Sequence, residues 1–78
     1  MAALTQQIET DLRERIDSGD FPNGKLPSER ELASAYEAGR TTIRLILTRL
    51  TAEGLIEPRH GKGYFVRGAA NDQAAETN

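Results

Sequence analysis

The sequence predicts a domain of the α+β class that is mainly helical, with three helices followed by a C-terminal β-hairpin. Three observations lead to this prediction. Apolar residues recur every four positions near the N-terminus, two further helical patterns lie between residues 28 and 54, and two β-prone runs flank residues 60–63. Helices and strands present one face with periods near 3.6 and 2 residues, so the patterns distinguish the two kinds of element.

The composition of the 78 residues limits what the protein can be. A chain of this length forms one domain with a small core, because it buries only about 60% of the surface that it exposes when unfolded. It has no cysteine and one histidine, which argues against a disulfide framework, a thiolate metal site and a zinc finger. No apolar run reaches about 20 residues and no signal peptide is visible, so we expect a soluble, cytoplasmic protein.

Charge is distributed unevenly along the chain. The net charge of −2 argues, by itself, against nucleic acid as a partner. Residues 24–67, however, carry eight basic and five acidic residues, and the acidic excess lies in residues 1–23 and 68–78. Because potentials between exposed charges act over about 8 Å at physiological salt, a local basic face can bind DNA despite the acidic total.

The first predicted helix ends at Gly19 and has an apolar stripe along one face. The stripe contains residues at a spacing of four: Leu4, Ile8, Leu12 and Ile16. We interpret it as the side that covers the core, and a docking surface for another domain or subunit is the alternative. Residues 19–25 contain two glycines, a proline and an Asn-Gly pair, which predict a loop with Phe21 beneath it.

The second predicted helix begins with a capping box. Ser28 is the N-cap and Glu31 follows three residues later, so each side chain can satisfy a backbone N–H that the helix leaves unpaired. Its core-facing residues are Leu32, Ala33 and Tyr36. A tight turn at residues 37–39 then leads directly into the third helix.

The third predicted helix begins near Arg40, stops at Gly54 and has two unlike faces. The apolar face is a stripe at helical spacing: Ile43, Ile46, Leu47 and Leu50. The opposite face carries hydroxyl groups, an arginine and one leucine: Thr41, Arg44, Leu45 and Thr48. A helix that enters the major groove of DNA needs this layout, because small residues permit close approach and arginine bonds guanine edges or phosphates.

Four motifs together resemble the GntR family of bacterial transcription regulators. They are Leu-Pro-Ser-Glu-Arg-Glu-Leu-Ala at 26–33, Arg-Thr-Thr-Ile-Arg at 40–44, Glu-Gly-Leu-Ile at 53–56 and Gly-Lys-Gly-Tyr-Phe-Val at 61–66. The resemblance covers residues 4–67 and slightly favours the HutC-like branch. It implies a winged helix-turn-helix domain at 1–67 with a short first strand at 25–26. Residues 68–78 contain no aromatic or β-branched apolar residue, which predicts a flexible tail or the stub of a linker.

The resemblance also implies which residues contact DNA. In the helix-turn-helix these are Arg30, Arg40, Thr41, Thr42 and Arg44, and at the tip of the wing they are His60, Gly61 and Lys62. Ordinary structural roles compete with this interpretation, because an exposed arginine can pair with a nearby glutamate and threonines often cap a helix start. The Gly-Lys-Gly run is not an ATP-binding loop, since the Walker spacing and the following helix are absent.

Two residues depart from the family pattern. Gly39 stands where the family usually has serine or threonine, so a hydroxyl that caps the recognition helix and contacts phosphate is missing. A serine there strengthens the cap unless Gly39 holds a positive φ, which serine would strain. Leu45 stands where the family is usually polar, and it is either an ordinary exposed leucine or an apolar contact to a thymine methyl group.

The function predicted from these observations is sequence-specific binding of double-stranded operator DNA by a transcription regulator, in the first place a repressor. The family's C-terminal domain senses a small-molecule effector and holds a homodimer, and this chain has no room for it, so we expect the isolated chain to be monomeric. A winged helix used for protein–protein contact is the alternative, favoured by Leu45, Gly39 and the acidic total. No nucleophile–base pair is visible, so we expect no enzyme, no cofactor and no metal.

Overall fold

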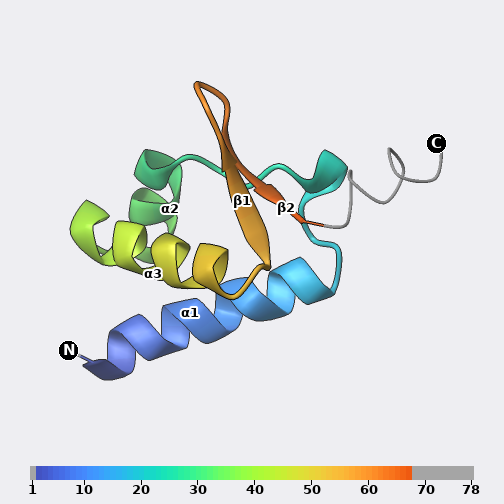
Figure 1. Cartoon of the computed structure of the whole chain (residues 1–78). Helices are drawn as coiled ribbons and strands as arrows, with labels where there is room; N and C mark the ends of the chain where they lie inside the picture. Colours follow the sequence, from blue (N-terminus) through green and yellow to red (C-terminus); the bar gives the residue numbers. More distant parts are fainter. Residues whose placement is uncertain (1, 68–78) are drawn as a thin grey trace, which may run out of the picture.

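Three helices and a β-hairpin make up the domain in the computed structural model, which describes residues 2–67 (Figure 1). The helices are α1 (Ala2–Asp17), α2 (Glu29–Tyr36) and α3 (Arg40–Ala52), with a short 3-10 turn, η1 (Pro22–Gly24), after α1. The strands β1 (Ile56–Arg59) and β2 (Gly63–Val66) follow α3. The predicted mainly helical α+β class is confirmed, whereas the tail or linker predicted at 68–78 lies outside the described residues.

The hairpin projects away from the helices, and α1 lies on the opposite side of the domain, beside α3 (Figure 1). Its two strands are antiparallel, with Cα partners running from Ile56 and Val66 to Arg59 and Gly63 at the tip. The short strand expected at residues 25–26 is present as a single bridge between Lys25 and Phe65. The Leu26 N–H also donates to the Tyr64 carbonyl at 3.0 Å, which joins this segment to β2.

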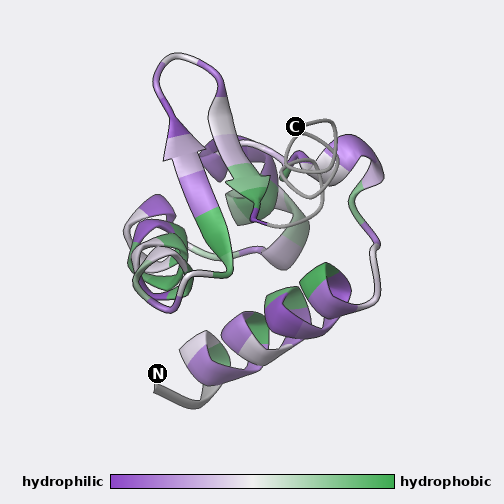
Figure 2. Ribbon diagram, turned by 45° about the vertical axis from the view of Figure 1, so that its right-hand side comes forward, coloured by the Kyte–Doolittle hydropathy of each residue, from purple (hydrophilic) through white to green (hydrophobic). Residues whose placement is uncertain are grey.

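The core lies where α1, α2, α3 and the base of the hairpin meet. Its buried side chains are Ile8, Leu12, Phe21, Leu26, Leu32, Ile43, Ile46, Leu47, Leu50 and Ile56. The apolar stripe predicted on the third helix is therefore buried in full, and Phe21 lies under the loop after α1 as predicted. Figure 2 shows the hydrophobic segments of α1 turned toward the rest of the domain and the hydrophilic segments turned outward.

The predicted stripe of α1 is only partly correct. Ile8 and Leu12 are buried and Ile16 packs partly buried against the core, but Leu4 is 46% exposed. The buried part of α1 begins one turn after Leu4, at Ile8. Residue spacing identifies the face of a helix, and it does not show where along that face the packing partner ends.

Side-chain and backbone caps set the two ends of α2, whereas α3 begins after Gly39, which has no side chain to cap it. The Ser28 Oγ accepts from the Glu31 N–H at 3.1 Å, and the Glu31 carboxylate accepts from the Ser28 N–H at 2.9 Å, so the predicted capping box is present. The turn at 37–39 is also confirmed. Its left-handed residue is Glu37, with φ of 52°, whereas Gly39 is extended, with φ of −72° and ψ of 153°.

The end of α3 directs the chain into the wing. Gly54 has φ of +81°, and the N–H of Leu55 donates to the Leu50 carbonyl at 3.0 Å, which closes the helix as expected for a glycine just past the C-terminus. Leu55 then accepts from the N–H of Arg67 at 2.9 Å, which ties the base of β1 to the residue after β2. No helix within residues 2–67 is long and apolar enough to cross a membrane.

Candidate nucleic-acid interface

The exposed start of α3 is held by a fully buried opposite side. Ile43, Ile46 and Leu47 have no exposed surface, so the helix cannot rotate without uncovering the core. Arg40, Thr41 and Arg44 are exposed as a consequence, and Thr42 is half-buried. The helix is thus positioned with a threonine and two arginines directed to solvent at its N-terminal end.

Glu29, the first residue of α2, brings the two exposed arginines together. Arg44 donates twice to its carboxylate, from Nε to Oε2 at 3.2 Å and from Nη2 to Oε1 at 3.0 Å. The Nη2 atom of Arg40 lies 3.7 Å from the same Oε1. The hydrogen bonds from Arg44 lower the pKa of the Glu29 carboxyl, and the charge of Arg40 acts in the same direction, so this carboxylate is ionised at neutral pH.

Sequence reasoning did not identify Glu29 as part of this site. An acidic residue in the first turn of a helix is favoured by the helix dipole wherever the helix lies, so its position alone carries no functional signal. The two arginines that it contacts are 11 and 15 positions later in the chain, beyond any spacing within one helix. Only the packing of α2 against α3 creates this group of three side chains.

Arg30 lies beside Glu29 in the first turn of α2 and is exposed. Within the described part of the chain, no carboxylate lies within ion-pair distance of it. The structural alternative considered from the sequence, pairing with a nearby glutamate, is therefore not what the structure has. We call the group formed by the half-buried Glu29 and the exposed Arg30, Arg40, Thr41 and Arg44 the recognition face.

The tip of the wing presents the other predicted residues. His60, Gly61 and Lys62 are all exposed where the hairpin turns (Figure 1). Gly61 has φ of +73°, a conformation that L side chains rarely adopt, and the Lys62 N–H closes the turn on the Arg59 carbonyl at 2.9 Å. The side chain of Arg59 instead lies over the Phe65 ring, 4.3 Å from its centroid. The tip therefore offers a lysine, a histidine and accessible backbone.

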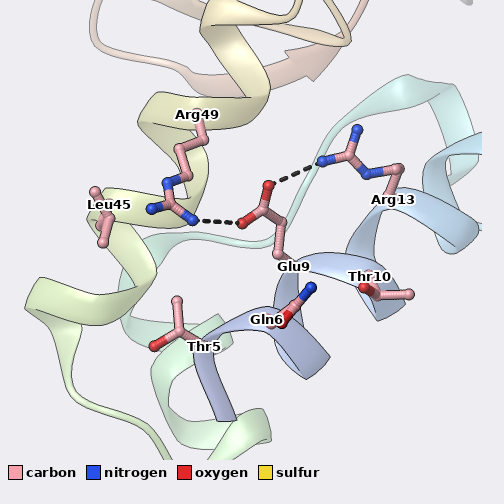
Figure 3. A pocket seen from close by; sticks show the side chains of 7 residues that line it. All are labelled: Thr5, Gln6, Glu9, Thr10, Arg13, Leu45 and Arg49. Atoms are coloured by element: carbon pink, nitrogen blue, oxygen red, sulfur yellow. Dashed lines mark hydrogen bonds and ion pairs between the residues drawn. The ribbon is translucent and has the colours of Figure 1, made fainter. Parts of the chain in front are cut away.

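On the other side of α3, arginines are paired with carboxylates within α1 and between α1 and the C-terminal part of α3. Figure 3 shows Glu9 of α1 between Arg13 and Arg49, at 2.8 and 3.1 Å. Arg13 also donates to Glu53 at 3.0 Å. Hydrogen bonding from Arg13 lowers the pKa of the Glu53 carboxyl. We call these four residues the α1–α3 charge cluster. Exposed pairs of this kind contribute little each, but they neutralise the local charge.

The two departures from the family pattern are placed clearly by the structure. Gly39 is extended, and a Cβ added to it meets nothing within 4 Å, so the positive φ that would exclude serine is absent. Leu45 is 45% exposed and lines a hollow of about 470 Å³ with Arg49 and residues of α1 (Figure 3). Leu45 is therefore an exposed leucine beside a groove between α1 and α3, and its contact with a thymine methyl group stays a prediction.

Comparison with known proteins agrees with this architecture. Residues 4–66 match the family model described as bacterial regulatory proteins, gntR family. The Exu regulon transcriptional regulator of Escherichia coli (strain K12) is 40% identical over 78 residues, which span 96% of this chain and 30% of that protein. The HTH-type transcriptional repressor NagR of Bacillus subtilis (strain 168) is 38% identical over 71 residues, which span 90% of this chain and 29% of that protein.

A solved structure gives the same result for the fold. A chain in "Crystal Structure of mutant ORR3 in complex with NTD of AraR" superposes with a TM-score of 0.74 at 31% sequence identity. The superposition covers 81% of this chain and 91% of the other. The match is thus to a whole domain, whereas this chain spans only about 30% of the length of the curated relatives.

Proposed function

Because the chain belongs to the gntR family of bacterial regulatory proteins, we propose that it binds double-stranded operator DNA sequence-specifically, as the DNA-binding domain of a transcription regulator. The observation that carries the proposal is the recognition face. There α3 has a fully buried apolar side, and its exposed start presents Thr41 with two arginines. A helix of this kind fits the major groove, where an arginine fork bonds O6 and N7 of guanine.

The other residues are given supporting roles in this proposal. Arg30, Thr41 and Thr42 lie at helix starts, where hydroxyls, guanidinium groups and backbone N–H groups suit phosphate oxygens. His60, Gly61 and Lys62 contact the minor groove or its phosphates from the tip of the wing. Since the tip is a narrow loop with one lysine, its contribution to affinity depends little on sequence.

The regulatory role is proposed from the relatives. NagR is named a transcriptional repressor, and we propose repression for this protein as well. Because these two curated relatives are about three times as long as this chain, we further propose that an effector-binding, dimerising domain accompanies it. The effector would then act only through that domain. The protein would be cytoplasmic, and its dimer would bind the two half-sites of the operator. The HutC-like branch remains a prediction.

Selection of bound duplexes from a random pool tests the proposed function. We expect the chain to enrich a short motif, and the palindromic duplex built from it to bind more tightly than a scrambled duplex of equal length. Binding should weaken steeply as salt rises, because each phosphate contact releases condensed counterions. A pool without an enriched motif, bound with no salt dependence, would contradict the proposal.

A protein–protein contact module is the second candidate, and one observation favours it. Leu4 and Leu45 are the exposed large hydrophobic side chains among the described residues, and Leu45 lines the groove beside α1. If the domain binds a partner protein through this groove, substituting Leu45 by glutamate should abolish binding of that protein and leave duplex binding unchanged. If it acts on DNA, duplex binding should fall with Arg44→Ala and stay nearly constant when residues in the first turn of α1 are substituted.

A further inference from the structure

We infer that Glu29 is a positioning residue that determines sequence specificity: its carboxylate fixes the guanidinium group of Arg44 for a base edge and keeps both arginines from phosphates. The inference rests on the proposed function and assigns a role to a residue that is not itself basic. Three features of the recognition face support it. These are the way the hydrogen bonds of Arg44 are used, the rigidity of the carboxylate, and the charge balance of the group.

The first feature is the edge of the guanidinium group that Glu29 occupies. Arg44 uses Nε and Nη2, so the pairing is from the side of the group. Of the five N–H bonds of an arginine side chain, three remain, and the end of the fork formed by Nη1 and Nη2 still offers two parallel donors. Guanine accepts such a pair at O6 and N7. Glu29 therefore orients Arg44 without occupying the donors that read a base.

The second feature is that the carboxylate is the fixed member of the pair. Glu29 follows the N-cap Ser28, whose side chain and backbone are both engaged in the capping box. Leu32, one turn later in the same helix, is buried with 1% exposure. The Glu29 side chain is 19% exposed, against 63% for each of the two arginines. The arginines are thus the long and largely exposed side chains, and the less exposed carboxylate is the member of the pair that restricts them.

The third feature is the local charge. Two guanidinium groups share one carboxylate, so the group keeps a net positive charge while an acceptor lies between the donors. A carboxylate repels phosphate, which every duplex presents in the same way, and it can accept a hydrogen bond from the N4 amino group of cytosine. Without Glu29, both arginines are free to turn to the nearest phosphate. Affinity for all sequences then rises, and the preference for one sequence falls.

The test compares Glu29→Gln with a matched control, Glu31→Gln. Both variants remove one negative charge from the first turn of α2, and glutamine also serves at the third position of a capping box. Glu31 is bonded to the cap of α2 rather than to an arginine of the recognition face. The probes are the duplex that the unmodified chain selects from a random pool and a scrambled duplex of equal length. Both are titrated over a range of salt concentrations.

We expect Glu29→Gln to lower the ratio of affinities for selected and scrambled duplexes by about tenfold or more, the order of one bidentate base contact. The magnitude of its salt slope on the scrambled duplex should increase by about 0.9 for each arginine that gains a phosphate contact on B-DNA. Glu31→Gln should leave the affinity ratio unchanged. A role limited to helix stability moves neither the ratio nor the slope, so the two readouts separate positioning from folding.

Arg44→Lys is a second variant that does not depend on how Glu29→Gln folds. Lysine keeps the charge at an exposed position but has no planar fork, so we expect the same loss of sequence preference with affinity for scrambled duplex retained. Equal ratios for Glu29→Gln, Glu31→Gln and the unmodified chain would overturn the inference, and so would an unchanged preference in Arg44→Lys. If the unmodified chain enriches no motif, the proposed function itself fails, and this inference with it.

Discussion

The recognition face and the α1–α3 charge cluster use the same residue types in opposite ways. In the cluster, Glu9 binds Arg13 and Arg49, and Arg13 also binds Glu53, so carboxylates match arginines in number. On the recognition face two arginines share Glu29, and Arg30 has no carboxylate within ion-pair distance in the described part of the chain. An arginine therefore becomes a candidate DNA contact through the neighbours that packing assigns to it. The total charge of −2 does not reveal this difference.

The largest expected effect concerns self-association, and it tests whether the α1 side of the domain forms an interface with a second copy of the chain. We predict that the chain is a monomer at micromolar concentration in sedimentation, because most of its large apolar side chains are used by its own core. Joining two copies with a linker that spans two half-sites should then raise the affinity for a palindromic duplex by about 10²–10⁴-fold. A stable dimer of the free chain would mean that Leu4 or Leu45 forms an interface, which would break the comparison.

The second effect concerns the arginines of the recognition face. Arg44→Ala, and separately Arg40→Ala, should weaken binding to the selected duplex by roughly 5- to 150-fold, the range for loss of one bidentate base contact. Binding to scrambled duplex should change much less, as titration of both duplexes at one salt concentration shows. Equal losses on the two duplexes would assign these arginines to phosphate contacts instead.

The third effect concerns the wing, which carries one lysine at an exposed tip. Lys62→Ala should weaken binding to every duplex by a similar factor and reduce the salt slope by about one, as expected when one phosphate contact is lost. The slope is measured from affinities at several salt concentrations. If it does not change, Lys62 makes no contact with phosphate.

A smaller effect is expected at the start of α3. Gly39 is extended and has open space around it, so Gly39→Ser is free of the strain that a positive φ would cause. Serine should raise the stability by a few tenths of a kcal/mol through the helix cap and add a hydroxyl donor for phosphate. A thermal melt and a duplex titration measure the two parts. A lower melting midpoint would rule out the capping explanation.

The smallest effect is expected in the α1–α3 charge cluster and serves as the internal control. Arg49→Ala removes an exposed arginine that is already bound to Glu9, 3.1 Å away. We expect the affinity for selected and scrambled duplexes to change by less than about twofold, because the charge removed is locally neutralised. A loss of duplex affinity comparable to that of Arg44→Ala would show that pairing with a carboxylate does not distinguish the α1–α3 charge cluster from the recognition face.

Much of the fold follows from periodicity and end signals in the sequence. The capping box at Ser28 and Glu31, the stop at Gly54 and the buried stripe of α3 are local features, because each depends on residues within a few positions of one another. The exposure of Leu4 was predicted wrongly, since the end of a packing surface depends on another element. The strand expected at 25–26 is reduced to one bridge for a similar reason: its partner lies in β2.

The sequence by itself therefore determined the order and type of the elements, and it located the exposed residues of α3 and the tip of the wing. The tertiary structure decided which charges meet. It placed Glu29 against Arg44 and Arg40, and Glu9 against Arg49, across separations of 11 to 40 residues. The physical reason is one of range. Caps and periodic burial act within one or two turns of the chain, whereas an ion pair between helices exists only after their buried sides have packed.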